Sequence, residues 1–249
     1  MTYGAFLAIW LLPALLAVAA LVASKPLPLL PHFHTRSLKS LWVFLAIVAL
    51  LYTTPWDNYL VANHIWTYPP ERVWGIRLGW VPLEEYLFFV LQTTLTTLWL
   101  EVPVRWKGAK WLSARGNPSV WSVVGVGFII LGLIAWGIFL WGEWPQGTYF
   151  LLITGWALPV IGGQLFLARK FVGYFKRYVF AGIAMPTLYL WAADTWAIRE
   201  GIWHITEATS LGVALPGGLP IEEAFFFAVT NAMVAVGWLL VRIFPPRAV

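Results

Sequence analysis

The sequence repeats one acidic phrase, and the carboxyl groups of that phrase are the clearest candidates for chemistry in this chain. The two copies are Pro82-Leu83-Glu84-Glu85-Tyr86-Leu87-Phe88-Phe89 and Pro220-Ile221-Glu222-Glu223-Ala224-Phe225-Phe226-Phe227. Each copy opens an apolar segment, where a carboxylate held at bilayer depth costs roughly 2.5–3.5 kcal/mol. Because this cost recurs at matched positions, we expect the four glutamates to serve a function. A carboxyl group in an apolar pocket is a candidate general acid near neutral pH.

The same phrase also suits the start of a helix. Proline is tolerated at the first helical position, and carboxylates in the first turn face the positive end of the helix dipole. Adjacent helical residues point about 100° apart, so one glutamate of each pair should face the interior and the other a neighbouring helix or the interface. The sequence leaves open which of the two faces inward.

Aromatic residues are abundant around these glutamates, since the chain holds 18 Trp and 16 Phe. Ring faces attract cations by roughly 0.5–2 kcal/mol each. A pocket lined by such rings would stabilise a cationic intermediate without offering a nucleophile that could trap it. An acid beside an aromatic pocket is what the protonation of an alkene requires.

The composition predicts an all-α integral membrane protein. Of the 249 residues 60% are hydrophobic and 11% are charged, with a mean hydropathy of +0.75, whereas soluble proteins carry about 25% charged residues. Zero Cys excludes disulfides, thiolate metal sites and cysteine nucleophiles. Seven stretches are apolar and long enough to span about 30 Å of hydrocarbon. They are 3–24, 39–55, 83–101, 119–141, 148–168, 178–198 and 221–243.

The repeat extends beyond the acidic phrase. Asp57 lies nine residues before Trp66, and Asp194 lies nine residues before Trp203. The second copy of this pair follows the first by 137 positions, and the acidic phrase recurs after 138. Each Asp is predicted near the outer end of its helix, where a structural cap is as good an interpretation as catalysis. Each Trp could equally belong to the interfacial belt of aromatic residues.

We therefore expect a single transmembrane domain, 1–249, made of two three-helix pseudo-repeats and a central helix. The first pseudo-repeat is 1–104, the linker helix region is 105–145 and the second pseudo-repeat is 146–249. Because one helix separates two halves of three helices each, the halves should cross the membrane in the same direction. The axis that relates them should then lie along the membrane normal. Both glutamate pairs would then lie at one depth and face each other.

Charge in the connections predicts the orientation. Thirteen of the sixteen basic residues fall on one side of the predicted membrane, and ten of the eleven acidic residues, all but Glu101, fall on the other. The basic set is Lys25, Arg36, Lys39, Arg105, Lys107, Lys110, Arg115, Arg169, Lys170, Lys176, Arg177, Arg242 and Arg247. The positive-inside rule then places the N-terminus outside and the C-terminus in the cytoplasm of a multi-pass protein of the cell membrane. The net charge of +5 is better explained by anionic lipid headgroups than by nucleic acid.

The doubled Pro-x-Glu-Glu-x-x-Phe-Phe phrase, with its preceding Asp and Trp in a chain of seven spans, resembles the membrane-integral lycopene cyclase family of archaea, bacteria and carotenogenic fungi. In some members the two halves are separate polypeptides, and here they look fused. The resemblance covers most of residues 1–245. It implies a redox-neutral, cofactor-independent reaction in which a terminal double bond of a linear carotene is protonated, the cation closes a ring and proton loss gives a β-ionone ring.

The resemblance also implies roles for particular residues. Glu84, Glu85, Glu222 and Glu223 match the acidic motif and are the candidate acids and bases. Asp57 and Asp194 are second-tier candidates that would orient or share the proton. The candidates for lining the path of the polyene are Phe88, Phe89, Phe226, Phe227, Trp66 and Trp203. The implied substrate is a lipophilic carotene taken from the bilayer, with γ- and β-carotene as products.

Two other functions stay open. A carotenoid hydratase would use the same cation and let water capture it, and a small proton-coupled transporter could share the plan of three, one and three spans. No cofactor is expected, because Gly125-x-Gly127 lies inside an apolar span without the context of a dinucleotide fingerprint. No metal is expected either, since His32-x-His34 lies in a basic loop without nearby carboxylates. A homo-oligomer, or contact with other carotenoid enzymes, is left open.

Overall fold

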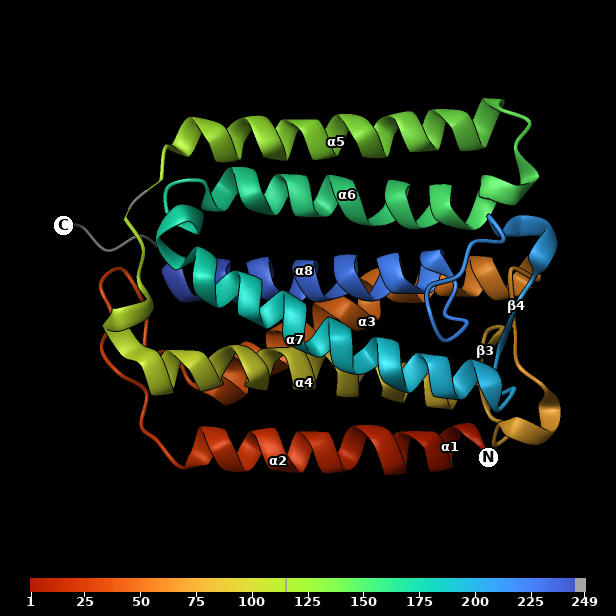
Figure 1. The fold of residues 1–249 in the computed structure, drawn as a ribbon, viewed down its shortest axis with the longest axis horizontal. Coiled ribbons are helices and arrows are strands. Elements are labelled where there is room, and N and C mark those ends of the chain that lie inside the picture. Colours follow the sequence, from red (N-terminus) through yellow and green to blue (C-terminus); the bar gives the residue numbers. More distant parts are fainter. Residues whose placement is uncertain (115, 245–249) are drawn as a thin grey trace.

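Seven long helices lie side by side within the residues that the computed structural model describes, 1–114 and 116–244 (Figure 1). The first is continuous from α1 (Tyr3–Phe6) through a π-helical turn (Leu7–Leu11) to α2 (Leu12–Ala23). The others are α3 (Leu38–Ala62), α4 (Leu83–Lys107), α5 (Pro118–Trp141), α6 (Thr148–Ala168), α7 (Val172–Arg199) and α8 (Ile221–Ile243). The prediction of an all-α protein is confirmed.

Six candidate membrane spans occur among the described residues, identified by length and apolar composition. They are the helices at 3–23, 38–62, 83–111, 118–141, 145–168 and 221–243. Helix α7 is long enough at 28 residues, but it is not among these six. It carries Lys176, Arg177 and Asp194 within its length, which lowers its hydropathy. The seventh crossing therefore stays a prediction.

Several helix boundaries differ from the predicted ones. Helix α3 continues to Ala62, with Pro55 inside it, so Asp57 is buried within the helix rather than placed at its outer end. Lys176 and Arg177 belong to the first turns of α7 and not to the preceding loop. Arg115 and Arg247, two members of the predicted basic set, lie outside the described residues.

Short strands tie the connections together at one end of the bundle, and the sequence did not predict them. Strand β1 (Trp66–Thr67) pairs antiparallel with β4 (His204–Ile205), so that Trp66 is opposite Ile205. Strand β2 (Arg77–Leu78) pairs with β3 (Val81–Pro82) just before α4. The 3₁₀ turns are Pro70–Arg72, Gly108–Trp111, Pro145–Gly147 and Glu207–Thr209. In this pair Thr67 is opposite His204, which lies 137 positions later in the sequence.

Helices α4 and α8, which carry the two acidic phrases, occupy the middle of the bundle. Helix α4 packs against α2, α3, α7 and α8, and α8 packs against α6, α7 and α3. Both begin at the end of the bundle where the strands lie, whereas α5 lies at the edge and packs on α6 (Figure 1). This arrangement brings the first turns of α4 and α8 to the same level.

A buried ion pair fastens α4 to α8 at the opposite end of the bundle. Glu101 accepts hydrogen bonds from the Arg242 guanidinium and, at 2.9 Å, from Trp238 Nε1. The side chains of Glu101 and Arg242 are fully buried. Arg242 is therefore a structural residue and not an exposed member of the basic set. Its guanidinium also donates to the carbonyls of His34 and Arg36, which holds the segment before α3 against the end of α8.

Candidate active site

Each acidic phrase forms the start of a helix, as its composition predicts. Pro82 and Pro220 are the extended residues that precede α4 and α8, and both glutamates of each phrase lie in the first helical turn. All four glutamates are buried, with exposed fractions of 0% and 4% for Glu84 and Glu85 and of 0% and 2% for Glu222 and Glu223. Such burial requires a partner for each carboxyl group.

The first glutamate of each pair holds the preceding loop. Glu84 accepts a hydrogen bond from the backbone N–H of Trp74 at 2.5 Å. Glu222 accepts one from the backbone N–H of Leu211 at 2.6 Å and another from the Ser210 hydroxyl at 2.9 Å. Trp74 and Leu211 are themselves 137 positions apart, so the same contact is made twice. We interpret Glu84 and Glu222 as groups that shape the loops above the site.

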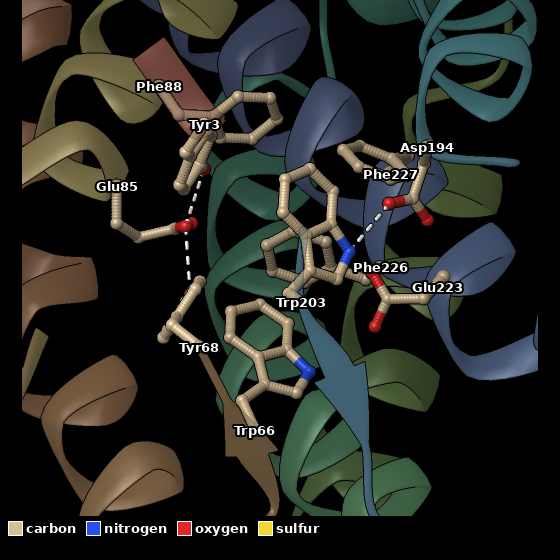
Figure 2. A pocket seen from close by; sticks show the side chains of 10 residues that line it. All are labelled: Tyr3, Trp66, Tyr68, Glu85, Phe88, Asp194, Trp203, Glu223, Phe226 and Phe227. Carbon is tan, nitrogen blue, oxygen red and sulfur yellow. Dashed lines mark hydrogen bonds between the residues drawn. The ribbon is translucent and has the colours of Figure 1, made fainter. Parts of the chain in front are cut away.

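The second glutamate of each pair points into a shared chamber between the two halves (Figure 2). The chamber encloses about 20 Å³, which is room for roughly one water molecule. Its lining is formed by Tyr3, Trp66, Tyr68, Glu85, Phe88, Asp194, Trp203, Glu223, Phe226 and Phe227. In Figure 2 Glu85 and Glu223 enter from opposite sides, with the two indoles between them. Two carboxyl groups therefore meet in one apolar, aromatic space.

Tyrosine hydroxyls hold both inward carboxyl groups. Glu85 accepts hydrogen bonds from Tyr3 at 2.6 Å and from Tyr68 at 2.9 Å. Glu223 accepts one from Tyr149 at 2.5 Å. Burial raises the pKa of the Tyr68 phenol well above its usual range, and the neighbouring Glu85 carboxylate raises it further. Tyr68 therefore stays protonated and remains a donor at neutral pH.

The two aspartates differ in their surroundings. Asp194 lines the chamber, and one of its oxygens accepts a hydrogen bond from Trp203 Nε1 at 3.0 Å. Asp57 is fully buried on α3, but it is not among the lining residues, and neither of its oxygens has a hydrogen-bond partner among the described residues. The matched spacing in the sequence therefore leads to two different environments.

Each indole packs on the tyrosine of the other half. The ring of Trp203 lies 5.0 Å from that of Tyr3, and the ring of Trp66 lies 5.7 Å from those of Tyr149 and Phe226. Both indoles line the chamber, so they are not merely members of an interfacial belt.

The structure brings together eight of the predicted site residues, namely Glu85, Glu223, Asp194, Phe88, Phe226, Phe227, Trp66 and Trp203. It leaves Glu84, Glu222, Asp57 and Phe89 outside the lining.

Sequence reasoning missed the three tyrosines that donate to the inward glutamates, of which Tyr3 and Tyr68 also line the chamber. Tyr3 and Tyr149 carried a usable signal, because each lies nine residues before a Leu-Pro step at Leu12 and Leu158. Tyr68 carried no such signal, since the position 137 residues later is Ile205.

Within the described residues no group of three His, Cys, Asp or Glu side chains is placed to hold a metal ion. The chemistry available to this chamber is proton transfer between carboxyl groups beside aromatic ring faces.

Comparison with known proteins identifies relatives over most of the chain. The sequence model of a family described as lycopene cyclase matches residues 4–102 and 146–239. A protein of Sporisorium reilianum named bifunctional lycopene cyclase/phytoene synthase is 36% identical over 94% of this chain and 34% of its own length. Proteins of the same name in Leptosphaeria maculans and Neurospora crassa are 41% and 36% identical, over 79% and 88% of this chain.

This chain spans about a third of the length of those relatives, at 35% and 36% of the Leptosphaeria and Neurospora proteins. The segment 103–145, which contains α5, falls between the two matched parts of the family model. No solved structure matches the chain significantly.

Proposed function

The chain belongs to the lycopene cyclase family, and we propose that it closes the ends of a linear carotene into β-ionone rings by acid–base catalysis, without a redox change. One observation carries the proposal: Glu85 and Glu223 enter a single aromatic chamber from opposite sides. The expected products from lycopene are γ-carotene, with one ring, and β-carotene, with two.

The proposed reaction is an isomerisation in which no atom is gained or lost. A carboxyl group gives its proton to the terminal double bond, and the opposite carbon of that bond becomes a cation. An internal double bond of the same end group then attacks the cation, which forms the ring bond and moves the charge into the ring. A carboxylate finally removes a proton from the carbon next to that charge, which restores a double bond.

The hydrogen bonds around the two glutamates favour different roles. Glu85 receives two phenolic donors, and donors stabilise the ionised form of a carboxyl group. Glu223 receives one phenolic donor and shares the chamber with Asp194. We assign Glu85 as the proton acceptor and Glu223, assisted by Asp194, as the proton donor. We assign the stabilisation of the intervening cation to Trp66 and Trp203, because both indoles line the chamber.

We also propose that the chain crosses the cell membrane seven times as two parallel pseudo-repeats, 1–104 and 146–249, joined by 105–145. Matched contacts support the repeat: Tyr52 donates to the Trp156 carbonyl, and Tyr189, 137 positions after Tyr52, donates to the Trp10 carbonyl. The proposed orientation has the N-terminus outside and the C-terminus in the cytoplasm. The chamber would then lie toward the outer leaflet, and the substrate would come from the bilayer.

The test is expression in bacteria that accumulate lycopene, followed by chromatography of the pigments. We expect new peaks of γ- or β-carotene with the natural chain and none with the double variant Glu85→Gln/Glu223→Gln. Glu143→Gln is a matched control, because Glu143 is exposed in the connection between α5 and α6. Unchanged lycopene in cells whose membranes contain the natural chain would contradict the proposal. A hydroxylated carotene would indicate a hydratase.

A further inference from the structure

A crevice opens on the side of the bundle directly behind the chamber. It lies between α3, α4, α6 and α8 and encloses about 170 Å³. Val48 and Tyr52, at its edge, are 46% and 40% exposed on the outer surface of the bundle. Phe226, at its inner end, lines both the crevice and the chamber. The crevice and the candidate active site therefore share Phe226 as a wall residue.

The crevice continues toward the other end of the bundle. A second hollow of about 590 Å³ shares Leu45, Val48 and Gln164 with the first and reaches Ser40 and Arg36. From Ser40 to Thr53 the two hollows follow α3 for about 20 Å at 1.5 Å per residue, which is a large part of the roughly 30 Å of hydrocarbon in a bilayer. We call the two hollows together the α3/α6 groove.

A column of nearly parallel rings forms one wall between the outer surface and the chamber. Tyr52 and Trp156 stack at 5.5 Å, Trp156 and Trp56 at 4.5 Å, and Trp56 and Phe226 at 5.6 Å, with interplanar angles of 16°, 16° and 6°. The Tyr52 hydroxyl also donates to the Trp156 carbonyl at 2.8 Å, which joins α3 to α6 at the edge of the groove. Because these rings cover one another's faces, the column presents ring edges, which suit edge-to-face contact with another π-system.

The corresponding positions of the other half do not form such a column. Tyr189 and Trp10, the counterparts of Tyr52 and Trp156, meet edge to face at 61°, and Ala193 occupies the position that corresponds to Trp56. Helix α7 also packs closely on α4, because Gly182 faces the side chain of Leu100. The ring column therefore breaks the pseudo-symmetry and marks one side of the bundle.

We propose that the α3/α6 groove is the lateral passage by which the polyene of the substrate reaches the chamber from the lipid, an inference that rests on the proposed function. The chamber has room for about one water molecule, so the reacting end group must displace side chains of the lining, and the rest of a long polyene must lie outside the chamber. The groove is the adjoining space that leads from the chamber to the outer surface of the bundle. Its occupant is the conjugated chain, which packs against the edges of the ring column.

The same geometry also determines the order in which the products form. One groove and one chamber hold a linear carotene with one end at the carboxyl groups. The second end reacts only after the one-ring product has left the groove and returned in the opposite direction. The one-ring carotene is therefore a free intermediate that mixes with the membrane pool.

The test measures both the carotene that copurifies with the protein, by its visible absorption, and the pigments formed. Val48→Trp fills the edge of the groove from α3, and Val160→Trp fills the same space from α6. Val126→Trp is the matched control, because Val126 is 44% exposed on α5 and is not among the residues of the groove. We expect each groove variant to lose copurifying carotene and turnover by about tenfold or more, which corresponds to about 1.4 kcal/mol, and the control to match the natural chain.

Three results would overturn the inference, and they are distinguishable. If the natural chain forms rings and both groove variants, present in the membrane at equal amounts, retain carotene and turnover, the polyene does not use the groove. If the groove variants lose copurifying phospholipid but not carotene, the groove holds lipid. If the natural chain itself neither retains nor cyclises carotene, the proposed function fails together with this inference.

Discussion

The two halves of the molecule place their carboxyl groups alike but surround them differently. Glu85 and Glu223 occupy matched positions and enter the same chamber, yet Glu85 has two phenolic donors and Glu223 has one. Asp57 and Asp194 also occupy matched positions, yet only Asp194 lines the chamber and has an indole partner. The halves therefore differ in the hydrogen-bond donors around the carboxyl groups and not in the backbone positions, as the proposed division into a proton donor and a proton acceptor requires.

The packing of the halves differs in the same way. Helix α4 packs closely on α7, whereas the corresponding pair, α8 and α3, touches at fewer points and leaves the α3/α6 groove open. A two-fold arrangement of identical halves would offer two passages and two equivalent carboxyl groups. The observed differences instead favour one passage and one pair of unlike carboxyl groups.

The strongest test of this comparison separates one chamber from two independent sites. We expect Glu85→Gln and Glu223→Gln, made singly, each to reduce turnover by roughly 10²–10⁴-fold, the usual contribution of a general acid or base. Two independent sites would instead leave about half of the activity in each single variant. The measurement is the initial rate of ring formation in membranes, normalised to the amount of protein. Glu84→Gln and Glu222→Gln serve as controls, because these residues bind loop backbone outside the chamber lining.

A smaller effect is expected from the aspartates. Asp194→Asn removes a carboxyl group from the chamber, and we expect turnover to fall by roughly 10²-fold, the low end for an acid–base group. Asp57→Asn changes a residue that does not line the chamber, so its turnover should stay near that of the natural chain. The same rate assay compares the two variants. Equal losses in both would show that the halves contribute equally and would contradict the assigned roles.

The third prediction concerns Tyr68, which has no counterpart in the second half. Tyr68→Phe leaves Glu85 with a single phenolic donor, as in the other half. A hydrogen bond to a charged group contributes about 1.5–3 kcal/mol, so we expect turnover to fall by about tenfold or more. Because the base must be ionised, loss of a donor to its ionised form should move the acidic limb of the pH–rate profile to higher pH.

The control for this change is Tyr86→Phe, because the Tyr86 hydroxyl binds the Leu78 carbonyl and Asn58 outside the chamber lining. A Tyr68→Phe profile that coincides with that of the natural chain would show that the second phenol does not tune the base.

The sequence was sufficient to predict the helices, the acidic helix starts and the aromatic character of the site. Hydropathy located the seven long helices, of which six are candidate spans among the described residues. The repeated Pro-x-Glu-Glu phrase located the turns that meet in the chamber. It could not show which glutamate faces inward, because that depends on where the loops place the N–H groups of Trp74 and Leu211. Nor could it show the end of α3, since Pro55 is accommodated inside the helix.

The differences between the two halves of the site could not be predicted from the sequence either. The Tyr68 contact depends on the path of the loop between α3 and α4, which also forms the unpredicted strands β1, β2 and β3. The ring column depends on the packing of α3 against α6 and α8, which single-chain periodicity does not reveal. Tyr52 and Trp156 of the column are 104 positions apart, and Tyr68 reaches Glu85, 17 positions later, through an irregular loop, whereas the repeat itself was visible from spacing alone.

The smallest predicted effect sharpens the comparison of packing. At Gly182 of α7 an added Cβ would lie 2.0 Å from Leu100 Cδ2, so Gly182→Ala should overpack the contact between α4 and α7. Overpacking of this kind costs about 1–3 kcal/mol, and we expect a lower midpoint in thermal unfolding of the detergent-solubilised protein. Gly163→Ala on α6 is the control, because nothing lies within 4 Å of its added Cβ. An unchanged midpoint for Gly182→Ala would show that α4 and α7 can move apart at little cost in stability. The packing difference between the halves would then not explain why the groove lies between α3 and α6 and has no counterpart in the other half.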